Sequence, residues 1–169
     1  MKPLKMNLEL SRDIFKICKD SIEMKLCYNN TFHVASQLMF SRKLDKSNLK
    51  IAYGFVDRKS IGMFFRHAFL IYKEEVIDVT ALLWREDIEN EYKELDYYTF
   101  KEYSFSDFDA YIDDISDNDG YPALNRVLVE EETVVSDKLM QIGLNYNPID
   151  YVDLLTMSSI INSKKKKTI

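Results

Sequence analysis

The chain has 169 residues, 46% of them hydrophobic, and a formal net charge of −5. This composition predicts one globular domain with a core of its own, and the acidic balance argues against direct binding to nucleic acid. No apolar run approaches the roughly 20 residues that a membrane-spanning helix needs, and the start of the chain has no secretory signal. Two cysteines are too few for a disulfide framework. We therefore expect a cytoplasmic protein with reduced cysteines and no membrane partner.

The first 48 residues predict two helices and a loop. Apolar side chains recur at helical spacing over residues 9–25, with charged residues mostly off that face. A second helical stretch runs over 27–40, and the polar segment 41–48 is typical of a loop.

The pattern then changes to one typical of strands. Residues 49–56 are rich in β-branched and aromatic residues and predict a strand, whereas 57–65 contains a glycine and predicts a connection. The runs 66–72 and 75–80 flank a short polar link, which indicates a β-hairpin.

The length of the hairpin turn decides which side chains share a face of the sheet. A two-residue turn at 73–74 would pair Tyr72 with Glu75. His67 and Asp78 would then lie on one face, as they would with a four-residue turn. A three-residue turn would separate them unless a bulge intervened.

The second half of the chain predicts shorter elements within the same domain. We expect one domain over 1–163 and a disordered basic tail over 164–169. The elements expected after the hairpin are an exposed acidic helix or loop at 85–94, a strand at 97–103, a helix from Ser106 to about Asp114, helical stretches near 124–129 and 136–142, and a final segment over 148–161.

Charge is distributed unevenly along the chain. Residues 1–85 contain 15 Lys and Arg against 9 Asp and Glu, whereas residues 86–137 contain 3 against 17. One interpretation is an acidic face that balances a basic face within a single fold. The other is an acidic surface that recruits a basic partner or mimics nucleic acid.

Three residues occur in the order and context that a catalytic triad requires. Cys27 opens the second predicted helix, His67 lies in one hairpin strand, and Asp78 lies in the other. A thiol needs a base to become a thiolate, and the base needs an acid to fix its tautomer. The positive end of the helix dipole also favours a thiolate at Cys27. We predict that the Cys27 sulfur and a ring nitrogen of His67 lie within about 4 Å, with Asp78 at the other nitrogen.

The other cysteine and the other histidine fit a structural role better. Cys18 lies on the apolar face of the first predicted helix and is expected to be a small buried hydrophobic residue. His33 does not share a helical face with Cys27.

These motifs resemble those of the papain-like/transglutaminase-like superfamily of cysteine hydrolases, most of all its small, often phage-borne members. The resemblance covers about residues 20–82 and rests on four motifs: Cys27-Tyr-Asn before a helix, Tyr53-Gly on a strand, His67-Ala-Phe, and Val76-Ile-Asp-Val-Thr80. It implies an α+β fold in which helices pack on a small antiparallel sheet.

The resemblance also implies roles for individual residues. Cys27 would be the nucleophile, His67 the general base and acid, and Asp78 the residue that orients His67. Papain-like enzymes place a glutamine before the cysteine as an oxyanion donor, but residues 19–26 contain none. Asn29, Asn30 or backbone amides would have to supply that donor.

Two classes of function therefore remain open. The first is a cysteine-dependent hydrolase or acyl transferase acting on an amide bond of a protein or peptide, with a basic target favoured. Protease, deamidase, transglutaminase and acyltransferase are not distinguished. The second is a non-catalytic phage-encoded inhibitor or binding module acting through its acidic surface at 86–137. We expect no cofactor and no metal, because the sequence has no phosphate-binding loop, dinucleotide fingerprint or zinc motif, and 117–120 fails as a calcium loop.

Overall fold

The computed structural model describes residues 2–24, 26–61, 63–83 and 88–116. Along the chain these form β1 (Lys5–Met6), α1 (Leu8–Cys18), α2 (Cys27–Phe40), β2 (Leu49–Arg58), β3 (Met63–Tyr72), β4 (Glu75–Ile77), α3 (Ile88–Glu91), β5 (Leu95–Ser104) and α4 (Phe108–Ser116). The predicted helices at 124–129 and 136–142, the segment 148–161, the domain end at 163 and the tail at 164–169 lie outside the described residues. Within the described ranges, no helix has the length and apolar character needed to cross a bilayer.

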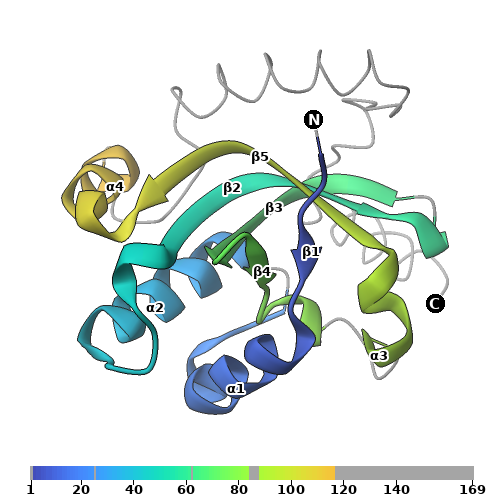
Figure 1. The fold of residues 1–169 in the computed structure, drawn as a ribbon, viewed down its shortest axis with the longest axis horizontal. Coiled ribbons are helices and arrows are strands. Elements are labelled where there is room, and N and C mark those ends of the chain that lie inside the picture. The colour runs from blue at the N-terminus through green and yellow to red at the C-terminus, as the bar shows by residue number, and fades with distance from the viewer. Residues whose placement is uncertain (1, 25, 62, 84–87, 117–169) are drawn as a thin grey trace, which may run out of the picture.

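The molecule is an α+β fold built on one curled five-stranded sheet. The strand order is β1-β4-β3-β2-β5, antiparallel except for the parallel pair β1 and β4. Leu4 and Tyr97 then form an isolated bridge through two backbone hydrogen bonds of 2.8 and 3.1 Å. The bridge links the residue just before β1, one edge strand of the sheet, to β5, the other edge strand. Figure 1 shows β1 crossing to meet β5.

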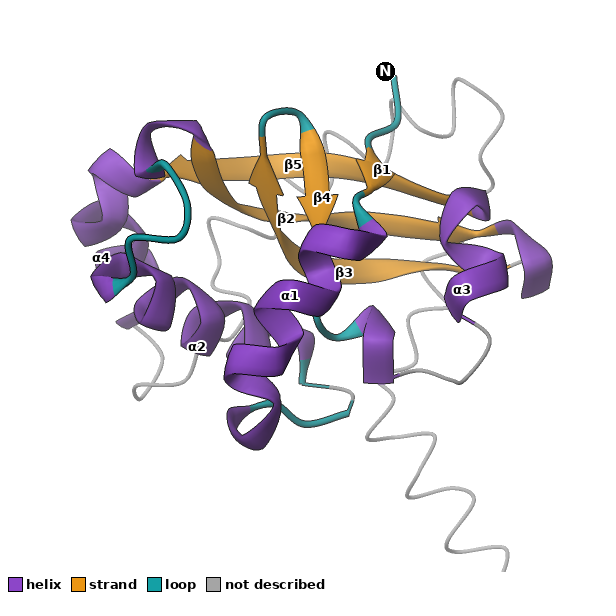
Figure 2. Ribbon diagram, turned by 60° about the horizontal axis from the view of Figure 1, so that its bottom comes forward, coloured by secondary structure: helices purple, strands orange, loops and turns teal. Residues whose placement is uncertain are grey.

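Two apolar clusters pack against opposite faces of the sheet. Figure 2 shows α1 and α2 on the same side of the strands. The first cluster joins α1, α2 and α4 to the sheet and includes Ile14, Val34, Leu38, Ile51, Tyr53, Leu70 and Tyr111. The second cluster joins β1 and α3 to the other face and includes Met6, Val56, Phe69, Ile71, Ile88, Leu95 and Tyr97. Because the side chains of a strand alternate, β3 contributes to both clusters.

The hairpin between β3 and β4 has the predicted two-residue turn. Tyr72 pairs with Glu75, and Leu70 pairs with Ile77. Lys73 and Glu74 adopt φ values of 49° and 64°, the left-handed pair that a type I′ turn requires. The predicted even loop is confirmed, although neither turn residue is the Asn or Gly that usually marks it.

The prediction of a connection over 57–65 was wrong. β2 continues to Arg58 and β3 begins at Met63, with only a short 3₁₀ turn between them. Arg58 is nearly buried and forms an ion pair with Glu91. Because Glu91 is far from Arg58 in the sequence, their pairing could not be predicted. The charged end of β2 was therefore assigned to a connection.

The first predicted helix ends earlier than expected. α1 stops at Cys18, a 3₁₀ turn covers Lys19–Ser21, and the chain is extended at Ile22, which is buried. The chain leaves the helix there because Ile22 enters the core.

Four acidic residues in the described part of the acidic segment form ion pairs with basic residues from the first 60 positions. The ion pairs are Glu89 with Arg12, Glu91 with Arg58, Asp96 with Lys5 and Lys59, and Glu102 with Lys50. These contacts favour the interpretation in which acidic and basic faces neutralise each other within one fold.

Candidate active site

Cys27 is the first residue of α2, at the positive end of the helix. The preceding residue, Leu26, has no side chain that can cap the helix, and no side-chain cap is present. The first backbone N–H groups of α2 therefore point toward the thiol region without an intrahelical acceptor. Cys27 is half-buried, so a reagent can reach its sulfur.

His67 lies in the part of β3 that does not pair with β4. β4 pairs only with the last three residues of β3, Leu70–Tyr72, and ends at Ile77. The chain then turns away at Asp78, beside the part of β3 that holds His67. The start of α2 lies close to His67 there, since the Cys27 side chain is near enough to contribute to the raised pKa of the imidazole.

The imidazole of His67 joins the thiol to a carboxylate. Its Nε2 atom lies 2.7 Å from Oδ2 of Asp78, and both side chains are almost fully buried. Nδ1 is then the ring nitrogen that faces Cys27. Burial alone would lower the pKa of His67, but the negative charge of Asp78 and the contact with Cys27 outweigh it and raise the pKa to about 10. The site therefore favours an imidazolium at neutral pH.

Asp78 is held by partners from three other parts of the fold. The hydroxyl of Tyr97 donates to Oδ2 at 2.9 Å, and the backbone N–H of Ala81 donates to Oδ1 at 2.9 Å. The backbone N–H of Asp78 itself donates to the Ser11 hydroxyl of α1 at 3.1 Å. These hydrogen bonds fix the orientation of the Asp78 carboxylate. A carboxylate held in this way can in turn orient the imidazole of His67.

Asn30 has a different role from the one predicted. Its amide nitrogen donates to the Glu23 carbonyl at 2.7 Å and to the Thr80 hydroxyl at 3.0 Å, and its oxygen accepts from the Glu23 N–H at 2.9 Å. Both amide hydrogens are used inside the protein, so Asn30 cannot be the oxyanion donor. It ties the loop before Cys27 and the segment after Asp78 to α2.

Asn29 remains a candidate for the oxyanion donor. It is half-buried in the first turn of α2, two residues after Cys27. The backbone amides of this turn are the other candidates, since they lack intrahelical acceptors.

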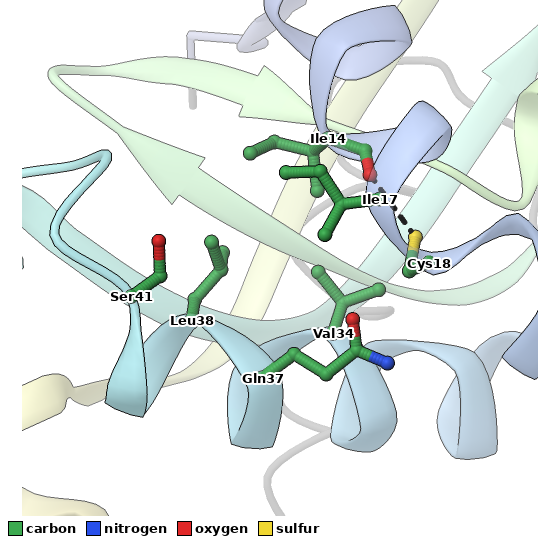
Figure 3. Close-up of a pocket in the computed structure, with 7 residues that line it drawn as sticks. All are labelled: Ile14, Ile17, Cys18, Val34, Gln37, Leu38 and Ser41. Carbon is green, nitrogen blue, oxygen red and sulfur yellow. Dashed lines mark hydrogen bonds between the residues drawn. The ribbon is translucent and has the colours of Figure 1, made fainter.

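Cys18 and His33 lie away from this arrangement. Cys18 is 1% exposed and its thiol donates to the Ile14 carbonyl at 3.3 Å. Burial raises the pKa of the Cys18 thiol to about 11. Figure 3 shows this thiol beside a shallow hollow between α1 and α2, which none of the three predicted triad residues lines. His33 is exposed on α2.

Sequence reasoning assigned no role to three residues that support the site, Tyr97, Ser11 and Thr80, although Thr80 ends one of the four motifs. Ser11 and Thr80 are short polar residues that are completely or almost completely buried, and Tyr97 was assigned to a strand without a role. Ser11 lies within α1 and Thr80 lies two positions after Asp78, and short polar residues at such positions are too common in sequences to identify these contacts.

No protein-family model, curated protein or solved structure matches this chain in our comparisons.

Proposed function

We propose that the protein is a cysteine-dependent hydrolase or acyl transferase that acts on an amide bond of a protein or peptide. The observation that carries the proposal is the His67 imidazole, held between the Cys27 thiol and the buried Asp78 carboxylate. The resemblance to the papain-like/transglutaminase-like superfamily supports the same reading.

The chemistry follows from these positions. The Cys27 thiolate attacks the amide carbonyl carbon, and the carbonyl oxygen becomes an oxyanion near the first turn of α2. The His67 imidazolium gives its proton to the departing amine, and the C–N bond breaks to leave a thioester. Water or a second amine then attacks the thioester while His67 accepts its proton, the C–S bond breaks, and the Cys27 thiolate and the His67 imidazolium are regenerated. Water as acceptor gives hydrolysis, and an amine gives transfer.

The reactivity of the two cysteines tests the proposal. At neutral pH we expect iodoacetamide to alkylate Cys27 at least about tenfold faster than Cys18, because Cys27 is only half-buried and lies beside His67, whereas Cys18 is buried. The two sites are distinguished by peptide mass spectrometry of the full chain. Cys18→Ala should leave the fast phase intact, and Cys27→Ser should remove it.

The His67→Ala variant provides the mechanistic control. It should remain folded by circular dichroism and lose the rate advantage of Cys27 over Cys18. Equal, slow labelling of both cysteines in the wild-type protein would contradict the proposal. It would favour the alternative, a binding module or phage-encoded inhibitor that acts through its acidic 86–137 surface.

A further inference from the structure

The hydroxyl of Tyr97 lies directly behind the His67–Asp78 pair. It donates to Oδ2 of Asp78, the same oxygen that faces Nε2 of His67. Tyr97 is completely buried, and burial together with the Asp78 charge raises its pKa well above the ordinary value. The phenol is therefore a donor to Asp78 at neutral pH.

Tyr97 is also fixed by the closure of the sheet. Its backbone forms the bridge to Leu4, and its hydroxyl lies 3.8 Å from the sulfur of Met6 in β1. The Phe69 ring packs edge-on against the Tyr97 ring, with centroids 5.0 Å apart. The position of the hydroxyl thus depends on the meeting of β1 with β5.

We propose that Tyr97 is a positioning residue of the Cys27–His67–Asp78 site, whose hydroxyl holds the Asp78 carboxylate in place and shares its negative charge. This inference rests on the proposed function. Among the described residues, the titratable groups facing His67 are Cys27 from α2, Asp78 after β4 and Tyr97 from β5.

Removal of the Tyr97 hydroxyl has a definite electrostatic sign. With the imidazolium present, the Asp78 charge is partly neutralised, whereas with neutral imidazole it is not. A donor to Oδ2 therefore stabilises the deprotonated pair more than the protonated pair. Loss of this donor should make His67 harder to deprotonate.

The test is the pH profile of Cys27 alkylation, measured on the full chain. The rate should show an alkaline inflection where His67 loses its proton and the thiolate loses its partner. Tyr97→Phe should move this inflection upward by about one pH unit, the size expected for one hydrogen bond to a charged group. Tyr98→Phe, which removes the neighbouring hydroxyl on the opposite face of β5, should leave it unchanged.

A second substitution covers the case in which Tyr97→Phe fails to fold. Site-specific 3,5-difluorotyrosine at position 97 keeps the shape and the hydroxyl but is a stronger donor, so the inflection should move downward. A wild-type inflection that neither substitution moves would overturn the role of Tyr97 and leave the proposed function intact. Slow, equal labelling of both cysteines in the wild-type protein would overturn the proposed function itself, and the role of Tyr97 with it.

Discussion

The amide of Asn30 makes three hydrogen bonds, two to Glu23 in the chain leading into Cys27 and one to Thr80 after Asp78. We expect Asn30→Ala to lower the free energy of unfolding by about 1–3 kcal/mol, because buried polar partners lose their bonds. It should also slow Cys27 alkylation, since the loop at Glu23 is no longer tied to α2. Urea denaturation and alkylation kinetics measure the two effects.

Asn29→Ala is the matched control for this prediction. Asn29 neighbours Asn30 in the same helical turn but is only half-buried. A change within about 0.5 kcal/mol is expected for such a position. If the two alanine variants lose equal stability, the structural role assigned to Asn30 is wrong.

At the residue scale, the sequence offered few candidates where a residue type is rare and no clear candidate where it is common. The chain has two cysteines and two histidines, so Cys27 and His67 had few rivals. Eleven tyrosines gave no comparable signal for Tyr97, because the direction of its hydroxyl depends on pairing with β1. Asn30 was misassigned because an amide near a nucleophile can serve the backbone as readily as a substrate.

At the scale of elements, the close approach of β2 to β5 depends on Gly54. Gly54 pairs with His67 on β3 and with Thr99 on β5, at the point where a bulge shifts the register between the two strands. A Cβ atom at position 54 would lie 1.9 Å from the carbonyl oxygen of Tyr98. The backbone of β5 would have to move, and the adjacent Tyr97 would move with it.

Gly54→Ala should therefore destabilise the protein by about 3 kcal/mol or more, at or above the usual range for overpacking. It should also remove the rapid alkylation of Cys27 in whatever fraction remains folded. Thermal unfolding followed by circular dichroism gives the first quantity. Ala52→Gly, two positions earlier on the same face of β2, should cost only about 1 kcal/mol. Similar losses in both variants would argue against a steric role for Gly54.

The sequence predicted most of the long elements but not the short ones. α2, β2 and β5 lie close to their predicted positions, because each has a sustained apolar period. β1 has only two residues, Lys5–Met6, and was not predicted, since a strand of this length has no period to detect. Its existence depends on partners in β4 and β5 that only the folded chain brings together.

At the scale of the whole molecule, one carboxylate joins three separate segments. Asp96 of β5 lies 2.5 Å from the amine of Lys5 in β1 and 2.5 Å from that of Lys59, which follows β2. Burial alone would raise the pKa of Asp96, but hydrogen bonds from the two lysines outweigh it and lower the pKa. The folded state thus binds a proton at Asp96 less readily than the unfolded state does.

This shift makes stability depend on pH in a known direction. The contribution of Asp96 is present above its unfolded pKa of about 3.9 and is lost as the pH falls through the lower folded value. Both lysines are about half exposed, with side-chain exposures of 53% and 50%, so solvent screening limits the contribution to about 1 kcal/mol or less.

Urea denaturation between pH 7 and pH 3 measures this contribution. Asp96→Asn should be less stable than the wild type at pH 7, and the difference should shrink toward pH 3. Asp109→Asn, an exposed position on α4, should follow the wild-type curve. A constant difference between Asp96→Asn and the wild type across the range would contradict the linkage.

Under the proposed function, the bridge between Leu4 and Tyr97 also determines when, during folding, the site around Cys27 becomes complete. His67 and Asp78 are 11 residues apart across a tight hairpin, a local contact that can form early. Met6 and Tyr97 are 91 residues apart, and contacts of such long separation close slowly. The carboxylate is therefore fully oriented only after β1 and β5 have met. Under the proposed function, a nascent chain in which β5 is not yet made lacks the Tyr97 contact to Asp78, so the site is completed only when β1 and β5 have met.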